Sequence, residues 1–415
     1  MALIVQKYGG TSVANPERIR NVARRVARFR ALGHQVVVVV SAMSGETNKL
    51  IALAKEIMPD PDPRELDVLV STGEQVTIAL LSLALMDLGV KAKSYTGAQV
   101  RILTDGAHTK ARILQIDEDN IRRDLNAGHV VVVAGFQGVD EAGDITTLGR
   151  GGSDTTGVAL AAALKADECQ IYTDVDGVYT TDPRIESRAR RLEKVSYEEM
   201  LEMASLGAKV LQTRSVELAM AKQVPVRVLS SFIEPDENGV LPAKSGTLIC
   251  DEEEIVEKRI VSGVTMSRDE ARITLLGLSD RVEAPADVFT RLAEANVNVD
   301  MIVQSQARTE GAVNLTFTTG RRDAPRAAEL MRAAQAEIGF EEIRVDEDVA
   351  KVSVVGVGMR SHAGVAQTMF RALADKGVKF QAISTSEIKI SVLIDAAYAE
   401  LAVRALHSAY GLEAV

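Results

Sequence analysis

The sequence of 415 residues has no tryptophan, few other aromatic residues and only two cysteines. Aromatic residues make up 4% of the chain, so no platform for stacking nucleic-acid bases is expected. Cys169 and Cys250 are too few for a disulfide framework and suit a reducing compartment. The N-terminal segment MALIVQKYGG lacks the plan of a signal peptide, and no uninterrupted apolar run approaches the ~20 residues that span a bilayer. We therefore expect a cytoplasmic protein with no membrane partner.

Basic residues are outnumbered as well. Lys and Arg total 48 against 58 Asp and Glu, which gives a formal net charge of -10. Nonspecific binding to nucleic acid needs a basic surface, so no nucleic-acid partner is expected. A composition that is 46% hydrophobic and 26% charged is ordinary for a globular protein, and the length suits two or three domains of roughly 150 residues.

Short β-rich runs alternate with helical patterns over residues 1–250. The clearest runs are residues 35–40, 129–133 and 169–173, and the first is continuous and β-branched, as in strands that are covered on both faces. Asn15-Pro16 begins a helical pattern, and Gly33 ends it. Strands interleaved with helices predict an α/β domain of three layers with a mainly parallel sheet. Ligands of such sheets bind at the carboxyl ends of the strands, where glycine-rich loops fall here.

The remainder of the chain contains an internal repeat. Arg272–Gly277 is similar to Lys351–Gly356, and Phe289-x-x-Leu292 is similar to Phe370-x-x-Leu373 at an offset of 370 − 289 = 81 residues. Each copy is predicted to be a small α+β sandwich with the element order β-α-β-β-α. The charged stretch at 251–258 marks a boundary. The predicted division is 1–250 for the first domain, 251–264 for a linker, 265–345 for the first repeat and 346–415 for the second.

Two glycine-rich loops are the main candidates for anion binding. Lys7-Tyr8-Gly9-Gly10-Thr11-Ser12 lies between a strand and a capped helix, where backbone N–H groups, the helix dipole and the lysine charge all favour an anion. Gly149-Arg150-Gly151-Gly152-Ser153-Asp154 precedes an alanine-rich helix, and its guanidinium suits a carboxylate. The structural alternatives are a tight turn with a solvated lysine and a helix cap at Ser153 or Asp154.

Two further segments allow a structural and a functional interpretation. Ser71-Thr72-Gly73-Glu74 before the apolar run 76–85 reads as a helix-capping box, or Glu74 binds a substrate ammonium. Residues 173–184 form an Asp/Gly/Pro-rich loop that is either a plain turn or a nucleotide contact with Arg184 near phosphates. The five histidines show no metal-ligand spacing, so no metal site is predicted. A carboxylate acceptor is already ionised at pH 7, so phosphoryl transfer to it needs no general base.

The chain resembles the aspartate kinases in five motifs that occur in the same order. They are Lys7-x-Gly-Gly-Thr-Ser, Ser71-Thr-Gly-Glu, Ala134-Gly-Phe-Gln-Gly138, Gly149-Arg-Gly-Gly-Ser-Asp154 and Thr173-Asp-Val-Asp-Gly177. The C-terminal repeat resembles the tandem ACT domains of that family, which have a ferredoxin-like α+β fold. The resemblance implies an amino-acid-kinase fold and transfer of the γ-phosphoryl group of ATP, carried with Mg²⁺, to the β-carboxylate of L-aspartate. The product would be 4-phospho-L-aspartate, on the way to lysine, threonine, methionine and diaminopimelate.

The resemblance also assigns roles to individual residues. Lys7, Gly9, Gly10 and Asp154 would be catalytic, and Thr47, Glu74, Arg150 and Ser153 would bind aspartate. ATP would be surrounded by Lys7, Tyr8, Gly9, Gly10, Ser41, Thr173, Asp174, Tyr179, Asp182, Arg184, Lys209 and Val210. Feedback amino acids, lysine or threonine or both, would contact Asn296, Asn298, Asp300, Gln304, Ser361, His362 and Ser384. ACT domains pair edge to edge, so a homo-oligomer is expected.

The chain departs from the family pattern at one loop of the first repeat. The family usually has Pro-Gly there, whereas this sequence has Glu283-Ala284. Alanine is strained at a positive φ, so effector binding at this loop is not carried over. The second repeat keeps Ser361-His-Ala-Gly364.

Two other functions fit parts of the sequence. One is a kinase for glutamate or N-acetylglutamate, although an N-acylated acceptor would leave Glu74 without an ammonium to bind. The other is a catalytically silent amino-acid sensor built on the ACT repeat, which the intact set of Lys7, Arg150 and Asp154 disfavours.

Overall fold

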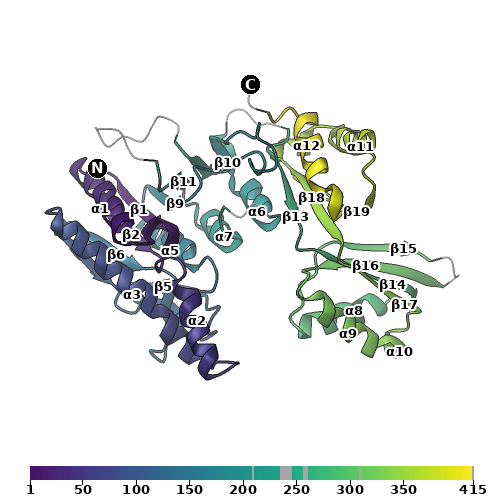
Figure 1. The fold of residues 1–415 in the computed structure, drawn as a ribbon, viewed down its shortest axis with the longest axis horizontal. Helices are drawn as coiled ribbons and strands as arrows, with labels where there is room; N and C mark the ends of the chain where they lie inside the picture. The colour runs from purple at the N-terminus through teal and green to yellow at the C-terminus, as the bar shows by residue number, and fades with distance from the viewer. Residues whose placement is uncertain (208–209, 234–244, 256–259, 308–310, 414–415) are drawn as a thin grey trace. The chain divides into compact units, whose positions relative to one another are not determined.

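The computed structural model describes the chain apart from residues 208–209, 234–244, 256–259, 308–310 and 414–415. The chain forms two compact units (Figure 1). The first unit comprises Met1–Val178, Arg191–Ala204 and Lys209–Val256, and the second comprises Tyr179–Arg190, Ser205–Ala208 and Glu257–Val415. The short segment Tyr179–Arg190 therefore leaves the first unit and packs with the C-terminal part of the chain.

One eight-stranded sheet forms the centre of the first unit. The strand order is β10-β12-β11-β9-β1-β2-β6-β3, and all neighbours are parallel except β11 and β12. The bounds are β1 Leu3–Tyr8, β2 Gln35–Val40, β3 Ala92–Tyr95, β6 Val130–Ala134, β9 Glu168–Thr173, β10 Lys194–Ser196, β11 Val226–Ser230 and β12 Thr247–Cys250. The predicted mainly parallel sheet is confirmed.

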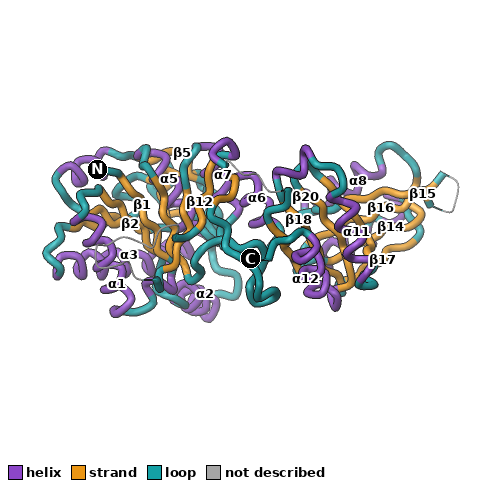
Figure 2. The backbone as a smooth tube through the Cα atoms, turned by 90° about the horizontal axis from the view of Figure 1, so that it is seen from above, coloured by secondary structure: helices purple, strands orange, loops and turns teal. Residues whose placement is uncertain are grey.

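Helices cover both faces of this sheet, and Figure 2 shows them flanking the strands. Helices α1 (Pro16–Ala31) and α3 (Pro63–Asp87) share a buried cluster with alternate residues of the central strands, including Tyr8 and Val40. Because side chains alternate along a strand, Lys7 points to the opposite face, where α5 (Gly152–Leu164) packs on β1 and β9. The three-layer arrangement thus separates the lysine from the apolar cluster under α1 and α3.

The remaining elements of the first unit lie around this core. The helices are α2 Glu46–Ile57, α4 Asp119–Asn126, α6 Tyr197–Ser205 and α7 Thr213–Lys222, with short 3-10 turns at Gly10–Val13 and Glu252–Glu254. A small sheet has the order β5-β4-β7-β8, with β4 Ile102–Thr104, β5 Ile113–Ile116, β7 Gln137–Val139 and β8 Ile145–Thr147.

The carboxyl ends of four central strands stand level with one another. The last residue of β1, Tyr8, is in register with Val40 of β2 and with Tyr172 of β9, and Val40 is in register with Ala134 of β6. The loops after β1, β6 and β9 include three of the motifs singled out in the sequence, those at Lys7, Gly135 and Asp174, whereas the Arg150 loop follows β8 of the small sheet. Parallel pairing therefore brings loops from distant parts of the chain to one edge of the sheet.

Helix α3 differs from the prediction. It begins after Asp62, whose side chain accepts hydrogen bonds from two backbone N–H groups of the first turn, and it runs through Ser71 and Thr72. The Ser71 and Thr72 hydroxyls donate to carbonyls three residues earlier, so of the two alternatives for this segment the capping box is wrong. Within the described residues, α3 is the one helix long and apolar enough to cross a membrane, yet half of that window is buried inside the protein. It is a core helix of the first unit.

The second unit contains two four-stranded antiparallel sheets. One has the order β15-β16-β14-β17 and carries α8, α9 and α10, and the other has the order β13-β18-β20-β19 and carries α11 and α12. The bounds are β13 Gly263–Ser267, β14 Ala271–Ser279, α8 Ala284–Glu294, β15 Ile302–Gln306, β16 Ala312–Thr319, α9 Ala324–Ala333, α10 Gln335–Ile338, β17 Glu342–Asp346, β18 Val349–Val355, α11 Val365–Asp375, β19 Phe380–Thr385, β20 Lys389–Asp395 and α12 Ala399–Ala409, with 3-10 turns at Val357–Ser361 and Ala396–Tyr398.

The two repeats are interleaved in sequence. Strand β13 precedes the first repeat but pairs with β18 in the sheet of the second. The predicted start of the first repeat is residue 265. Residues 265–267 are instead the last residues of β13, and they pair with β18 in the sheet of the second repeat. A buried lysine also joins the repeats: Lys351 of β18 forms ion pairs with Glu270 at 2.7 Å and with Asp300. Both partners belong to the first repeat.

Candidate functional site

A buried ion pair lies at the centre of the predicted site. Lys7 is 8% exposed and Asp154 is 7% exposed, and the lysine Nζ lies 2.5 Å from a carboxylate oxygen of Asp154. Lys7 stands near the end of the central strand β1, and Asp154 stands in the first turn of α5. A carboxylate in this position is favoured by the helix dipole, which helps to offset the loss of hydration. The pair fixes the lysine at the carboxyl edge of the sheet.

The glycines after Lys7 keep the neighbouring loops close. A Cβ on Gly10 would lie 3.0 Å from the carbonyl oxygen of Ala42, which follows β2. The backbone N–H of Gly9 donates to the carbonyl of Tyr172 in β9. A Cβ on Gly9 would meet the Lys7 Nζ at 3.6 Å, so this position leaves the ammonium accessible to a ligand. Larger residues would narrow the approach to Lys7.

The side chain of Tyr8 differs from its predicted role. Its ring is fully buried and stacks on Tyr172 with centroids 4.6 Å apart, on the face of the sheet opposite Lys7. The predicted ATP contact of Tyr8 is therefore restricted to its backbone. The carbonyl of Tyr8 accepts a hydrogen bond from the N–H of Ser41, a second predicted nucleotide residue. Ser41 is half-buried in the loop after β2, and Thr47 is half-buried in the first turn of α2.

Glu74 is the second buried acid of the site. It is 2% exposed, and one carboxylate oxygen accepts the backbone N–H of Ala42 at 2.9 Å. The other oxygen is buried and has no hydrogen-bond partner among the described residues. Burial raises the pKa of Glu74 to about 7, against the lowering effect of the Ala42 N–H. An unsatisfied buried oxygen with this pKa is suited to accept a hydrogen bond from a cationic ligand.

The loop before α5 has the backbone that its glycines allow. Gly149 and Gly151 have φ values of 78° and 71°, a region that favours glycine. Arg150 between them is exposed. Ser153 is buried in the first turn of α5, where its side chain lies against Gly135 in the loop after β6: a Cβ added to Gly135 would lie 2.8 Å from the Ser153 Oγ. The loops after β6 and β8 are thus held together at the same edge.

Asp67 is a buried acid that the sequence interpretation missed. Its carboxylate is fully buried and accepts hydrogen bonds from the backbone N–H of Thr147, the Thr147 hydroxyl, the N–H of Thr109 and the ring of His108. Asp67 and Glu74 are seven residues apart on one buried face of α3. This spacing of two acids in an apolar helix was the available signal. Asp67 fixes the end of β8, immediately before the loop of Arg150.

The predicted nucleotide residues fall into both units. Thr173 at the end of β9 and the exposed Asp174 belong to the first unit, where the Thr173 hydroxyl donates to the Asp174 carboxylate. Asp182 and Arg184 belong to the second unit and pair with each other at 2.7 Å. The arginine beside it lowers the pKa of Asp182. Tyr179 also belongs to the second unit, Val210 is half-buried in the first, and Lys209 lies outside the described residues.

The predicted effector residues of the first repeat have mixed surroundings. Asn296 follows α8 and has a φ of 54°, and Gly377 has a φ of 68° at the equivalent position after α11. Asparagine is one of the residues that adopt this left-handed conformation at the end of a helix, so the backbone alone accounts for an asparagine here. Asp300 is ion-paired with Lys351. Asn298 is exposed and accepts the Thr319 hydroxyl through its carbonyl, and Gln304 is exposed on β15.

The second repeat has a cavity near its predicted effector residues. The cavity has a volume of about 520 Å³ and is lined by Met359, Arg360, His362, Gly364, Val365, Ala366, Thr385, Ser386, Glu387 and Ile390. His362 is one of the predicted contacts, and its Nδ1 bonds the Gly358 carbonyl at 2.8 Å. Ser361 lies between the lining residues Arg360 and His362, and Ser384 precedes the lining residue Thr385 on β19. Arg360 and Glu387 form an ion pair at 3.4 Å in the lining.

The corresponding loops of the two repeats have different backbones. Gly364 has a φ of 99°, whereas Glu283 at the equivalent place has a φ of −79° and leads directly into α8. The strain expected for Ala284 is therefore absent, because Ala284 is the first residue of that helix and is fully buried. The loops differ in shape as well as in sequence.

Comparison with known families agrees with this geometry. Residues 2–230 match the amino acid kinase family, and residues 352–410 match an ACT domain. The chain is 62% identical to an aspartokinase of Pseudomonas aeruginosa over all of this chain and 98% of that protein. The chain belongs to the aspartokinases. The resemblance inferred from the five motifs and the fold class inferred from the strand pattern are both confirmed, and the chain is an ATP-dependent phosphotransferase by family.

Solved structures of relatives have the same fold. E. coli aspartokinase III in complex with aspartate and ADP is 29% identical, with a TM-score of 0.79 over 98% of this chain and 99% of that chain. The same enzyme in complex with lysine and aspartate has a TM-score of 0.75 at 28% identity, over 98% of this chain and 99% of that chain.

The raised pKa of Glu74 makes stability depend on pH. Between the ordinary value of 4.5 and about 7 the folded chain holds a proton that the unfolded chain has lost. The free energy of unfolding therefore falls as pH rises through this window, and Glu74 contributes up to about 3 kcal/mol of this fall. We expect Glu74→Gln to remove that fall. Urea denaturation of both proteins at pH 5 and pH 8 measures it, and an unchanged difference between the two pH values would show that Glu74 titrates normally.

Proposed function

We propose that the chain transfers the γ-phosphoryl group of ATP to the β-carboxylate of L-aspartate and gives 4-phospho-L-aspartate. The observation that supports this most is the buried pair of Lys7 and Asp154 at the carboxyl edge of the sheet. A relative of the same fold carries aspartate and ADP. The reaction supplies the start of a route to lysine, threonine and methionine, and we place it in the cytoplasm.

In this proposal Lys7 neutralises the charge of the phosphoryl group as it moves. Asp154 holds the ammonium in place through the 2.5 Å contact, so little reorganisation is needed during transfer. Gly9 and Gly10 let the phosphates approach because a side chain at either position would project toward Lys7 or Ala42. The remaining ATP contacts would come from the backbone of Tyr8, from Ser41, and from the residues assigned by resemblance: Thr173, Asp174, Tyr179, Asp182, Arg184, Lys209 and Val210.

Mg²⁺ would be carried by the nucleotide and would neutralise charge on the phosphates. Asp174 suits this ion: it is exposed at the carboxyl end of β9, one of its oxygens accepts the Thr173 hydroxyl, and the other can accept a metal-bound water.

The acceptor would be held by groups of opposite charge at its two ends. The unpartnered oxygen of Glu74 suits an ammonium, and the exposed guanidinium of Arg150 suits the α-carboxylate. Ser153 and Thr47 would complete the pocket. The β-carboxylate needs no activation by a base because it is ionised at pH 7.

Acceptor choice tests this proposal against the nearest alternatives. ADP release would be measured with L-aspartate, L-glutamate and N-acetyl-L-glutamate at saturating MgATP. We expect turnover of L-aspartate and little of the others, because an N-acyl group offers Glu74 no ammonium. Turnover of N-acetylglutamate without aspartate would identify a different acid kinase, and no ADP with any acceptor would identify an amino-acid sensor.

Replacement of Lys7 tests the catalytic assignment. Lys7→Ala should lower kcat by at least about 100-fold, because the charge that stabilises the transferring group is lost. Lys93→Ala is the matched control: Lys93 is half-exposed and pairs with Asp124 at 3.0 Å on strand β3 of the same sheet. Circular dichroism checks folding of both. Near-normal turnover of Lys7→Ala would remove the lysine from the mechanism.

We further propose that lysine, threonine or both inhibit through the second unit. The cavity beside His362 has a cation and an anion in its lining, Arg360 and Glu387, which match the carboxylate and ammonium of a free amino acid. Lysine is bound in one solved relative. The edge strands β15 and β19 expose apolar side chains, including Ile302, Phe380 and Ile383, which suit pairing of ACT domains in a homo-oligomer. In the first repeat, the candidates for effector contacts remain Asn296, Asn298, Asp300 and Gln304.

Inhibition by amino acids tests this assignment. Arg360→Ala should raise the concentration of lysine or threonine for half-inhibition by at least about 10-fold, because a charged hydrogen bond to the effector is lost. Its uninhibited kcat should not change. Arg371→Ala, which removes an exposed arginine paired with Asp375 on α11, is the control and should behave as wild type. If neither amino acid, alone or together, inhibits the wild-type protein, the regulatory proposal is wrong.

A further inference from the structure

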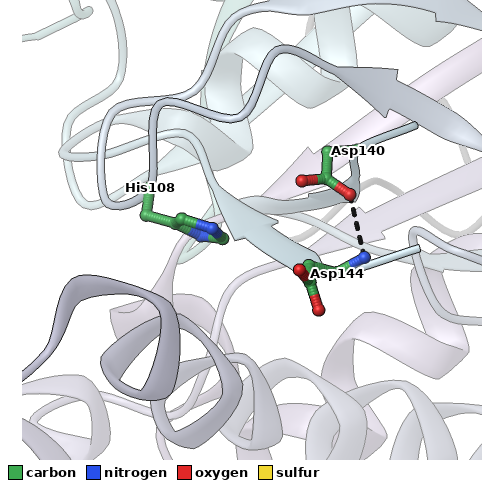
Figure 3. Close-up of side chains that lie close together, drawn as sticks. All are labelled: His108, Asp140 and Asp144. Carbon is green, nitrogen blue, oxygen red and sulfur yellow. Dashed lines mark hydrogen bonds between the residues drawn. The ribbon is translucent and has the colours of Figure 1, made fainter. Parts of the chain in front are cut away.

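Three side chains capable of binding a metal ion meet in the first unit (Figure 3). His108 follows β4, and Asp140 and Asp144 stand on either side of the turn between β7 and β8. One ligand atom from each lies within 4.8 Å of the other two, and all three residues are partly buried. None of them belongs to the predicted aspartate or ATP site. Histidine spacing in the sequence gave no sign of this cluster, because its members come together only through the pairing of the small sheet.

The ring of His108 is oriented by a buried acid. Its Nδ1 lies 3.0 Å from the carboxylate of Asp67, which is fully buried. An ionised carboxylate can only accept, so Nδ1 is the nitrogen that donates to Asp67, and Nε2 is the ring nitrogen left for a ligand. Metal-binding histidines are commonly held in this way by a carboxylate on the second ring nitrogen. The contact with Asp67 therefore prepares Nε2 as a ligand.

Each aspartate has one oxygen engaged and one available. One oxygen of Asp140 accepts the backbone N–H of Asp144, the bond drawn in Figure 3. The Arg64 guanidinium donates twice to a single oxygen, Oδ1, of Asp144. The second oxygen of each carboxylate makes no hydrogen bond to another described residue.

The charge of the cluster favours a cation. The carboxylates of Asp67, Asp140 and Asp144 carry three negative charges, and the Arg64 guanidinium supplies one positive charge. Arg64 also pairs with Glu65 at 2.5 Å and its side chain is about half-exposed, so it can turn toward that partner and away from an incoming ion. The three negative charges of Asp67, Asp140 and Asp144 then remain to attract a divalent cation.

We propose that His108, Asp140 and Asp144 bind a divalent first-row transition-metal ion of the zinc class. A nitrogen ligand with two carboxylates suits Zn²⁺ or Co²⁺ better than Mg²⁺ or Ca²⁺, which prefer oxygen ligands alone. Four-coordinate zinc places its ligand atoms about 3.4 Å apart, within the 4.8 Å limit inside which the three side chains already lie. Water completes the coordination. The ion ties the β7–β8 turn to the loop before β5, and through Asp67 to α3.

Metal titration of the untagged full-length protein tests the site. After dialysis against a chelator and without nucleotide, Co²⁺ is followed by its visible absorption and Zn²⁺ by displacement of Co²⁺. We expect one ion per chain and no displacement by Mg²⁺. His108→Gln and Asp140→Asn should each weaken binding by at least about 10-fold. Zn²⁺ should raise the thermal unfolding midpoint of the wild type more than that of either variant.

Asp117→Asn is the matched control. Asp117 is an exposed aspartate of the same unit and lies outside the cluster. Its carboxylate accepts the backbone N–H of Asp119, as that of Asp140 accepts the N–H of Asp144. It should bind Co²⁺ as wild type does. Circular dichroism shows whether each variant folds, and the two variants alter different elements, so loss of one to misfolding leaves the other decisive. Absence of a one-to-one complex in the wild type, or equal affinity in wild type, His108→Gln and Asp140→Asn, would overturn the proposal.

Discussion

The site depends on the burial of one lysine against one aspartate. Lys7 is the last but one residue of a strand that is covered on both faces, so its charge is removed from water and must be compensated within the protein. Asp154 provides this compensation from the first turn of α5, where the helix dipole already favours an anion. The position of α5 on the sheet and the direction of Lys7 are therefore linked. The lysine ammonium is thereby held in one direction at the carboxyl edge of the sheet.

Helix α3 carries two buried acids whose carboxylates accept different numbers of hydrogen bonds. Asp67 accepts hydrogen bonds from two backbone N–H groups, a hydroxyl and an imidazole, so its charge is fully compensated. Glu74, two turns later, has one N–H partner and one buried oxygen without a partner. The first acid stabilises the fold around the Arg150 loop. The second leaves a polar atom whose compensation a ligand can supply, which is typical of a binding site.

The second unit combines repetition with asymmetry. Both sheets have four strands, but the second obtains its edge strand β13 from before the first repeat. The two repeats are also joined by the buried Lys351 and its acidic partners, Glu270 and Asp300. Their loops before α8 and α11 differ in backbone as well as in sequence, because only Gly364 takes up a positive φ. The two repeats are consequently not equivalent in structure.

Much of the fold could be predicted because its signals are local. The β-branched run of β2, the Asn15 cap of α1 and the glycines beside Lys7 and Arg150 each restrict their own backbone, and the alternation of strands and helices follows from them. The five motifs also identified the family. The roles of the predicted site residues remain proposals, because these roles depend on bound ligands.

The sequence by itself determined the parallel sheet, the duplicated C-terminal part and the nature of the loops at the strand ends. Tertiary structure alone decided which side chains those elements bring together. Helical spacing could not show that Ser71 and Thr72 lie inside α3, because a hydroxyl residue favours a helix N-cap but can also donate to a carbonyl of the preceding turn inside a helix. Strand alternation buried Tyr8 opposite Lys7, and pairing of distant strands placed His108 beside Asp140 and Asp144. Such contacts depend on how distant segments of the chain pack and pair, and no local pattern records this.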